Sequence, residues 1–184
     1  MAYAVTHMLV AILAIEIYRN FFVKNNKIFP RYYILIAAIA GLIPDLDIAA
    51  YYVLYFFGFS FNEVHKTFMH SIFIPIGLFF IGMFFYKTGF KSSRLRKHKL
   101  KISVIFFIFS AGAIIHLILD AIYIEVSFLY PLVKTGIGLN LMSLIPVGLQ
   151  ELVPATIDGV LFLLWLMWME FKLKVDNYFN LSNN

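Results

Sequence analysis

The residues best suited to chemistry are two aspartates, Asp45 and Asp47, which are separated by one residue and follow Pro44. They lie in a chain that is mostly apolar, where a carboxylate is costly and usually faces a cavity, a partner or an ion. Two carboxylates this close repel each other unless a cation, a proton or a protonated histidine neutralises them. The pair therefore predicts a site for positive charge.

Histidines and a third aspartate are the further candidate ligands. His116 and Asp120 are spaced i, i+4, which places them on one face of a helix about one turn apart, as in the two-histidine helix of zinc proteases. His65 and His70 are five residues apart, so they converge only if His65 lies at or before a helix start. The predicted metal ligands are His7, Asp45, Asp47, His65, His70, His116 and Asp120.

The donor set restricts the ion. The chain contains no cysteine, which excludes thiolate ligands, disulfides and cysteine catalysis. Oxygen and nitrogen donors suit Zn²⁺, Mn²⁺ or Fe²⁺, and we expect zinc. Seven candidates exceed the three or four protein ligands of one zinc ion, so either two ions bind or some residues support the ligands and move protons. A two-ion site with mixed ligands is typical of phosphoester hydrolysis.

The composition indicates what must position these residues. The chain of 184 residues is 62% hydrophobic and 14% charged, whereas soluble domains carry roughly 25% charged residues. It is therefore predicted to be an integral membrane protein. Five stretches approach the length of about 20 apolar residues that a spanning helix needs. We expect them at 3–23, 32–44, 65–86, 102–124 and 157–171, the first being a retained span because it lacks the basic start and cleavage site of a signal peptide.

Two segments interrupt this pattern. Residues 51–61 are apolar but short, so they either extend the second helix or lie at the interface, and we favour a helix broken after Pro44. Residues 125–156 contain three prolines among apolar residues, which predicts a re-entrant or interfacial segment because bare loops are not stable in lipid. The predicted fold is an all-α polytopic membrane helix bundle, with one membrane-embedded domain at 1–175 and a polar cytoplasmic tail at 176–184.

The basic residues orient this bundle. Thirteen of the fifteen lysines and arginines follow the first, third or fifth span, and only Lys66 and Lys134 fall on the other side. The positive-inside rule then predicts a cell-membrane protein with its N-terminus outside and its C-terminus in the cytoplasm. Because such loops are typical of membrane insertion, we expect no nucleic-acid partner.

This orientation brings the candidate ligands to one depth. A single histidine in a membrane helix is more often a hydrogen-bonded packing residue, but seven polar side chains at the outer ends of several spans favour a metal site. Asp158 is either a helix cap favoured by the helix dipole or, with Ser71, a support for the ligands. Neither Ser71 nor Ser110 lies in a Gly-x-Ser-x-Gly elbow that would indicate a serine hydrolase.

The succession of motifs resembles a known family. It runs Thr6-His7, then Ile43-Pro44-Asp45-Leu46-Asp47, then His65-Lys66-Thr67-Phe68-Met69-His70-Ser71, then His116-Leu117-Ile118-Leu119-Asp120, with Tyr130-Pro131-Leu132 later. This order is similar to that of the membrane-bound metal-dependent hydrolases, which in bacteria include the LexA-regulated inner-membrane protein. The resemblance extends to about Asp158. Lys66 replaces the usual arginine and Met69 the usual threonine, and lysine lacks the bidentate fork of arginine.

Ligands and resemblance together predict a hydrolase of a phosphoester or lipid headgroup at the outer face, with membrane lipid as its surroundings. Its catalytic residues are predicted to be Asp45, Asp47, His65 and Lys66, the last neutralising a substrate anion. The alternative is a divalent-cation transporter or sensor that uses the same ligands. A transporter should continue its polar path, yet the inner half offers only Glu16 and Arg19. A third interpretation is a structural protein whose polar cluster holds helices together.

Overall fold

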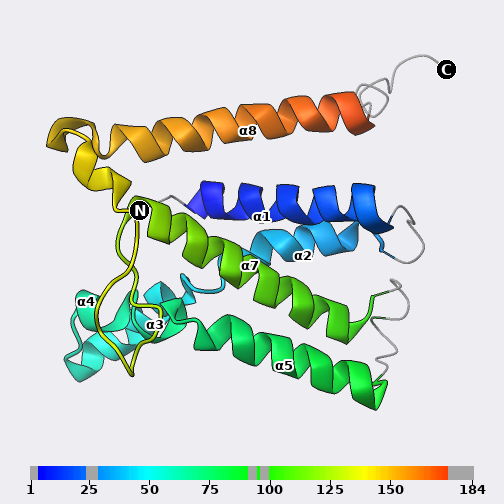
Figure 1. Cartoon of the computed structure of the whole chain (residues 1–184), viewed down its shortest axis with the longest axis horizontal. Helices are drawn as coiled ribbons and strands as arrows, with labels where there is room; N and C mark the ends of the chain where they lie inside the picture. Colours follow the sequence, from blue (N-terminus) through cyan, green and yellow to red (C-terminus); the bar gives the residue numbers. More distant parts are fainter. Residues whose placement is uncertain (1–3, 24–28, 91–94, 96–99, 174–184) are drawn as a thin grey trace.

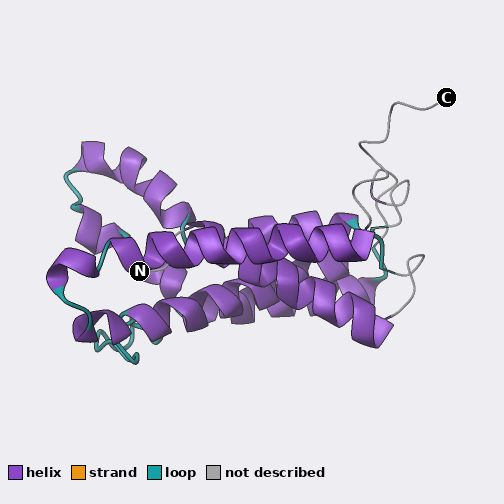
Figure 2. Cartoon of the chain, turned by 90° about the horizontal axis from the view of Figure 1, so that it is seen from above, coloured by secondary structure: helices purple, strands orange, loops and turns teal. Residues whose placement is uncertain are grey.

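Long apolar helices run side by side along one direction in the computed structural model of the chain (Figure 1). The structure describes residues 4–23, 29–90, 95 and 100–173, so the predicted tail at 176–184 and much of the basic loops lie outside the described residues. Short helices and connecting segments gather at one end of the long helices (Figure 2). The predicted all-α class is confirmed.

Within the described residues, three helices are long and apolar enough to cross a membrane. The first is α1 (Ala4–Tyr18), which continues into the π-helical turn η1 (Arg19–Val23). The others are α7 (Ile102–Tyr123) and α8 (Leu152–Leu173). Helix α5 (Phe73–Thr88) is apolar but shorter, and α2 (Tyr32–Ala40) is shorter still.

The second predicted span is interrupted earlier than expected. Helix α2 ends at Ala40, the chain turns through Gly41 to Asp45, and α3 (Leu46–Leu54) then begins. Because a proline ring clashes with the carbonyl four residues before it, the helix must end upstream of Pro44. The predicted break is present, and a new helix begins after Pro44, but α2 ends four residues earlier than the predicted span. Helix α3 closes with the turn η2 (Tyr55–Phe57), so this apolar segment is a separate short helix and does not extend α2.

The third and fifth predicted spans also begin elsewhere. His65 does not open a helix, because α4 (Phe61–Val64) ends before it and the turn η3 (Phe68–His70) precedes α5. Lys66 has a φ of 62°, a left-handed conformation that interrupts a helix. Helix α8 begins at Leu152 and not at 157, since Pro154 lies in its first turn, where a missing N–H is harmless.

The segment before α8 packs over the end of the bundle. Val126 and Ile137 form an isolated antiparallel bridge, and the turns η4 (Leu141–Leu144) and η5 (Val147–Leu149) follow. Ile72 N–H donates to Phe128 O at 2.8 Å, which ties this segment to the start of α5. The segment thus lies beside α3, α4 and the turn that carries His70.

Small residues let α2 pack closely between α1 and α7. A Cβ added at Gly112 of α7 would lie 2.4 Å from Ala40 Cβ, and one at Gly41 would lie 2.5 Å from His7 O. Such close approach is available only to glycine and is typical of membrane helix packing. The crossing brings the end of α2 against His7 and the part of α7 around Gly112.

The described basic residues near the ends of the long helices lie at the opposite end. Arg19 Nε donates to Phe29 O at 3.1 Å, and the N–H of Lys101 donates to the hydroxyl of Tyr33 at 2.7 Å. Lys87 lies in the last turn of α5, which runs antiparallel to α7 (Figure 1). One end of the bundle therefore carries the histidines and aspartates of the described residues, and the other carries these cations.

Candidate metal centre

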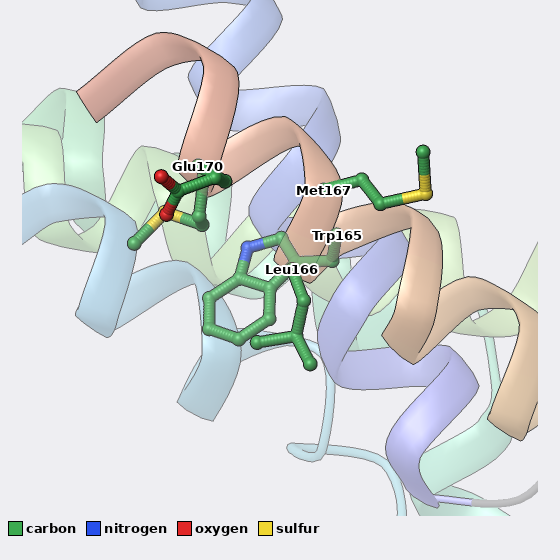
Figure 3. A pocket seen from close by; sticks show the side chains of 5 residues that line it. Trp165, Leu166, Met167 and Glu170 are labelled. Carbon is green, nitrogen blue, oxygen red and sulfur yellow. The ribbon is translucent and has the colours of Figure 1, made fainter. Parts of the chain in front are cut away.

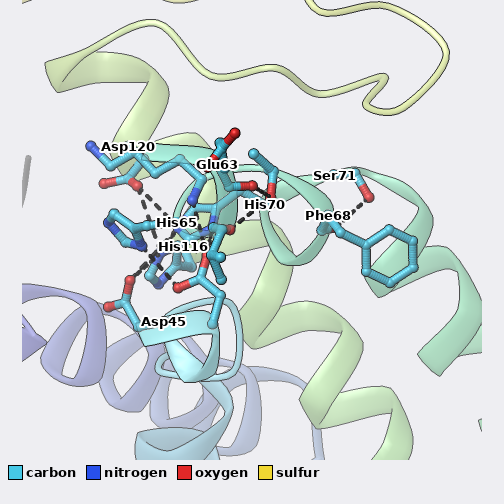
Figure 4. Close-up of polar contacts among 12 residues, drawn as sticks. Asp45, Glu63, His65, Phe68, His70, Ser71, His116 and Asp120 are labelled. Atoms are coloured by element: carbon cyan, nitrogen blue, oxygen red, sulfur yellow. Dashed lines mark hydrogen bonds and ion pairs between the residues drawn. The ribbon is translucent and has the colours of Figure 1, made fainter. Parts of the chain in front are cut away.

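Four side-chain atoms converge at the end of the bundle that holds the short helices (Figure 4). Asp45 follows the turn after α2, His70 ends η3, and His116 and Asp120 lie one turn apart on α7. The Nε2 atoms of His70 and His116 are 3.3 Å apart. Segments far apart in the sequence thus meet at one point.

The spacing of these atoms fits a tetrahedral ion. His70 Nε2 lies 3.6 Å from Asp45 Oδ1 and 3.5 Å from Asp120 Oδ2. His116 Nε2 lies 3.5 Å and 3.7 Å from the same two oxygens. Ligands about 2.0–2.2 Å from a central zinc ion define a tetrahedron whose edges are roughly 3.3–3.6 Å. Five of the six separations among the four atoms are therefore close to those that one zinc ion requires, and Asp45, His70 and His116 form a triad that can hold a metal ion.

Hydrogen-bond partners behind the two histidines orient their rings. His116 Nδ1 lies 2.8 Å from Gly41 O, which can only accept, so Nδ1 carries the proton and Nε2 presents a lone pair. His70 Nδ1 faces Asp47 Oδ2 at 3.0 Å, which favours the same tautomer. Carbonyl or carboxylate support behind a histidine is typical of metal ligands. His116 Nε2 therefore presents a lone pair toward His70 Nε2, where only a proton carried by His70 or a cation can lie between the two nitrogens.

Asp47 and His65 contact this centre through His70. Asp47 Oδ1 accepts a hydrogen bond from His65 Nδ1 at 2.8 Å, and Asp47 Oδ2 accepts one from the N–H of Lys66 at 3.0 Å. Both residues were predicted to be ligands, and with His70 they form one of three triads that can hold a metal ion. Asp47 thus orients the rings of His65 and His70.

His7 borders the centre on its other side. Its ring stacks on that of His116 with centroids 3.7 Å apart, and its Nε2 lies 3.4 Å from Asp120 Oδ1. Neither ring nitrogen of His7 has a hydrogen-bond partner among the described residues. Because Asp120 directs one oxygen to His7 and the other to His70, this carboxylate can serve two ions, consistent with the triad of His7, His116 and Asp120.

Burial leaves these groups in need of a cation. The side chains of His70, His116 and Asp120 are fully buried, and that of Asp45 is 15% exposed. Asp45 Oδ1, both oxygens of Asp120 and His65 Nε2 have no hydrogen-bond partner among the described residues. An uncompensated buried carboxylate is strongly destabilising. The donor set, free of sulfur, fits a divalent metal ion.

Electrostatics at the rim are consistent with this need. Burial by itself lowers the pKa of His70, but the facing carboxylates of Asp45 and Asp47 outweigh it and raise the pKa above its usual range. Burial lowers the pKa of the Lys66 ammonium, and the carboxylates of the cluster, Asp120 foremost, oppose that shift. The cluster thus attracts positive charge from its surroundings.

A polar cavity of about 720 Å³ opens beside the centre. His65 and Lys66 line it on one side, and Glu125, Tyr130 and Lys134 line it on another. Lys66 and Lys134 are the two basic residues that the sequence separates from all the others. Both therefore stand where an anionic molecule could reach the metal ligands.

The two predicted supporting residues, Asp158 and Ser71, make hydrogen bonds near the ligands. Asp158 Oδ1 accepts hydrogen bonds from the N–H of Thr6, at 2.9 Å, and from its hydroxyl. Asp158 is thus a cap, but for α1 and not for its own helix, and it holds α8 next to His7. Ser71 Oγ donates to Phe68 O at 2.7 Å and stabilises η3. Ser110 donates to Pro75 O at 2.8 Å, a packing contact.

Two residues at the site, Gly41 and Thr6, were not predicted from the sequence. The Gly41 carbonyl orients His116, and the available signal was a glycine at the end of an apolar helix just before buried aspartates. Thr6 donates hydrogen bonds to the capping Asp158, and the sequence indicated this only by placing Thr6 next to His7 near a helix start.

Apolar membrane helices with a buried His/Asp cluster at one end define an integral membrane protein with a candidate metal centre. Residues 1–175 match the family model described as YdjM inner membrane protein, and the chain belongs to this family. No curated protein and no solved structure matched the chain. The family confirms an inner-membrane protein, while hydrolysis stays a prediction.

Proposed function

We propose that the protein is a metal-dependent membrane hydrolase that acts on a phosphoester or a lipid headgroup. The observation that carries the proposal is the convergence of two histidine nitrogens and two carboxylate oxygens at one buried point, from Asp45, His70, His116 and Asp120. A packing cluster would pair each acceptor with a donor, whereas Asp45 Oδ1 and both oxygens of Asp120 have no hydrogen-bond partner among the described residues. Zinc is the proposed ion, as one ion or two, and Mn²⁺ or Fe²⁺ would use the same donors.

The residues around the centre have distinct tasks in this proposal. A bound ion supplies Lewis acidity and lowers the pKa of water. Lys66, with Lys134 across the cavity, neutralises the anionic part of the substrate. His65 lines the cavity and keeps its Nε2 without a partner among the described residues, so it can accept or donate a proton there. Asp47 holds His65 in that orientation.

The proposal includes a five-span topology, with α1, α2, α5, α7 and α8 crossing the membrane. The 16 residues of α5 extend about 24 Å at 1.5 Å per residue. Helix α2 is shorter, but it is enclosed by α1 and α7, and irregular backbone at membrane depth is tolerated where protein covers it. Helices α3 and α4 and the segment before α8 then lie at the outer interface, and the basic end faces the cytoplasm.

Metal content and hydrolysis test the function. Purified protein should carry about one equivalent of zinc or more per chain, and the Asp45→Ala/Asp47→Ala variant should carry little. Metal-loaded protein in phospholipid vesicles should release phosphate or headgroup, and both chelator and the double variant should stop the release. Equal, sub-stoichiometric metal in the two proteins would remove the basis for the proposal. The 87–101 loop should be cut by protease only from the cytoplasmic side.

The alternative function is cation transport or sensing. The observation in its favour is a second buried pair, Glu16 and Arg19, toward the other end of α1. Metal uptake into protein-containing vesicles without any hydrolysis would favour it. We prefer the hydrolase because no histidine or aspartate in the described residues links that pair to the candidate centre.

A further inference from the structure

A second cavity lies between α1, α2 and α8, at the end of the bundle opposite the candidate metal centre. Its volume is about 520 Å³, and most of its lining is apolar, including Ile12, Leu35 and Met169. Helix α8 lies beside α1 (Figure 1), yet only 6% of its most apolar stretch is buried in the protein. The cavity is therefore a lateral cleft under a helix that is otherwise largely uncovered.

Three charged residues line this cleft, Glu16, Arg19 and Arg31. Arg19 and Arg31 both line it, and they lie close enough for their guanidinium charges to repel each other. Glu16, also in the lining, offsets part of that repulsion. Arg19 is only 6% exposed, and its Nε donates a hydrogen bond to Phe29 O. Two cations against one anion leave the rim of the cleft positive.

A tryptophan forms the roof of the cleft. Trp165 extends from α8 toward α1 and α2 in Figure 3, where the residues drawn line an adjoining cavity of about 420 Å³. The buried Nε1 of Trp165 has no hydrogen-bond partner among the described residues. Tryptophan at a membrane interface usually joins an apolar region to a polar one, and here Trp165 lines the same cleft as the arginines and the apolar residues.

We propose that this cleft binds one anionic phospholipid. Its phosphate lies between Arg19 and Arg31, and an acyl chain lies under α8 beside Trp165 and Leu35. A guanidinium pair recognises phosphate oxygens, while the apolar walls exclude a soluble anion as the occupant. This site lies far from the cluster of His70 and His116, so it stands whether or not that cluster is hydrolytic.

Tryptophan quenching by brominated lipids tests the site. The chain contains two tryptophans, so Trp168→Phe leaves Trp165 as the sole reporter. This protein is placed in vesicles in which brominated phosphatidylglycerol or brominated phosphatidylcholine replaces part of the lipid. We expect half-maximal quenching at a several-fold lower fraction of phosphatidylglycerol. Arg31→Gln should lower that preference about fivefold, the effect of one cation near an anionic membrane surface.

Lys87→Gln is the matched control. Lys87 is exposed at the same basic end but lies on α5, outside the cleft, so this variant should keep the wild-type preference. Equal quenching by the two lipids overturns the proposal, as does a preference that Arg31→Gln leaves unchanged or that Lys87→Gln lowers equally. Trp165 shielded from both lipids would indicate a second copy of the chain and would also overturn it. If Arg31→Gln does not fold, the lipid ratio of the folded protein decides alone.

Discussion

Replacement of Asp120 by asparagine should abolish the stabilisation of the protein by metal. Asp120 Oδ2 lies 3.5 Å from His70 Nε2 and 3.7 Å from His116 Nε2, so it is one of the four converging atoms. An amide has nearly the same shape but carries no charge, and its oxygen is a weaker ligand. Asp47→Asn changes a residue that orients His70 at 3.0 Å and is not one of the four. Asp120→Asn should therefore lose more of the stabilisation by metal than Asp47→Asn does.

The magnitudes follow from linkage. At a free metal concentration of 100 Kd, binding stabilises the folded protein by about 2.7 kcal/mol. Loss of an orienting partner weakens metal binding roughly 10- to 100-fold, so Asp47→Asn should retain about 0.4–1.4 kcal/mol of this stabilisation at the same metal concentration. Loss of a ligand should weaken binding about 1000-fold or more, which leaves Asp120→Asn with almost none.

Thermal unfolding with and without metal measures this difference. For a chain of this size, 1 kcal/mol corresponds to about 2–4 °C, so metal should raise the Tm of wild type by about 5–11 °C. Asp47→Asn should show about 1–6 °C, and Asp120→Asn none. Glu170→Gln, which alters a carboxylate in α8 far from the centre, should respond as wild type does. If Asp120→Asn keeps the full metal response, or Asp47→Asn loses as much as Asp120→Asn, the assignment of ligand and orienting residue is refuted.

Three further variants test the elements around the centre. Gly41→Ala should destabilise the protein by about 1–3 kcal/mol and weaken metal binding, because the added Cβ meets His7 O at 2.5 Å; thermal unfolding and metal titration would measure both. Asp158→Ala should cost about 1–2 kcal/mol by removing the cap on α1, whereas Asp158→Asn should lose less because it keeps an acceptor; equal unfolding midpoints for the two would contradict this. Lys66→Met should leave metal content unchanged and raise KM for an anionic substrate about tenfold or less in a hydrolysis assay, the loss of roughly one charge-assisted contact; unchanged KM would show that Lys66 does not contact substrate.

The sequence predicted the helical membrane class because that property depends only on composition. An apolar content of 62% with few charges can be satisfied in lipid by helices, whatever their tertiary packing. It also indicated that the histidines and aspartates would lie together, because most of them sit near helix ends that a charge-based topology assigns to one side. Neither inference needed a contact between residues.

The helix boundaries at the site could not be predicted in this way. The end of α2 depends on a steric clash at Pro44 and on the approach of Gly41 to His7, which comes from another helix. The position of His65 depends on Lys66, whose left-handed conformation no propensity favours for lysine. The N–H of Lys66 donates to Asp47, so a tertiary contact stabilises that conformation. Local patterns therefore fail where long-range contacts decide the backbone.

The ranking of the ligands likewise required the structure. Seven candidates were equivalent in the sequence, but the direction of each ring separates them. The Nδ1 of His116 faces a carbonyl, so its Nε2 presents a lone pair to the Nε2 of His70 at 3.3 Å, while the Nδ1 of His70 faces a carboxylate. Two lone pairs at that distance repel each other unless a proton or a metal ion lies between them.

That repulsion separates a metal centre from a polar cluster that merely joins helices. Helices in lipid lack a hydrophobic driving force for association, and polar side chains then contribute by pairing donors with acceptors. Asp158 and Thr6 form such a pair, with an acceptor from α8 and two donors from α1. Around Asp45 and Asp120 the arrangement is the reverse, because acceptors from separate segments face one another. A proton can satisfy one such contact, whereas a divalent cation satisfies all of them at once, which is why the same bundle needs an ion at one place and not at the other.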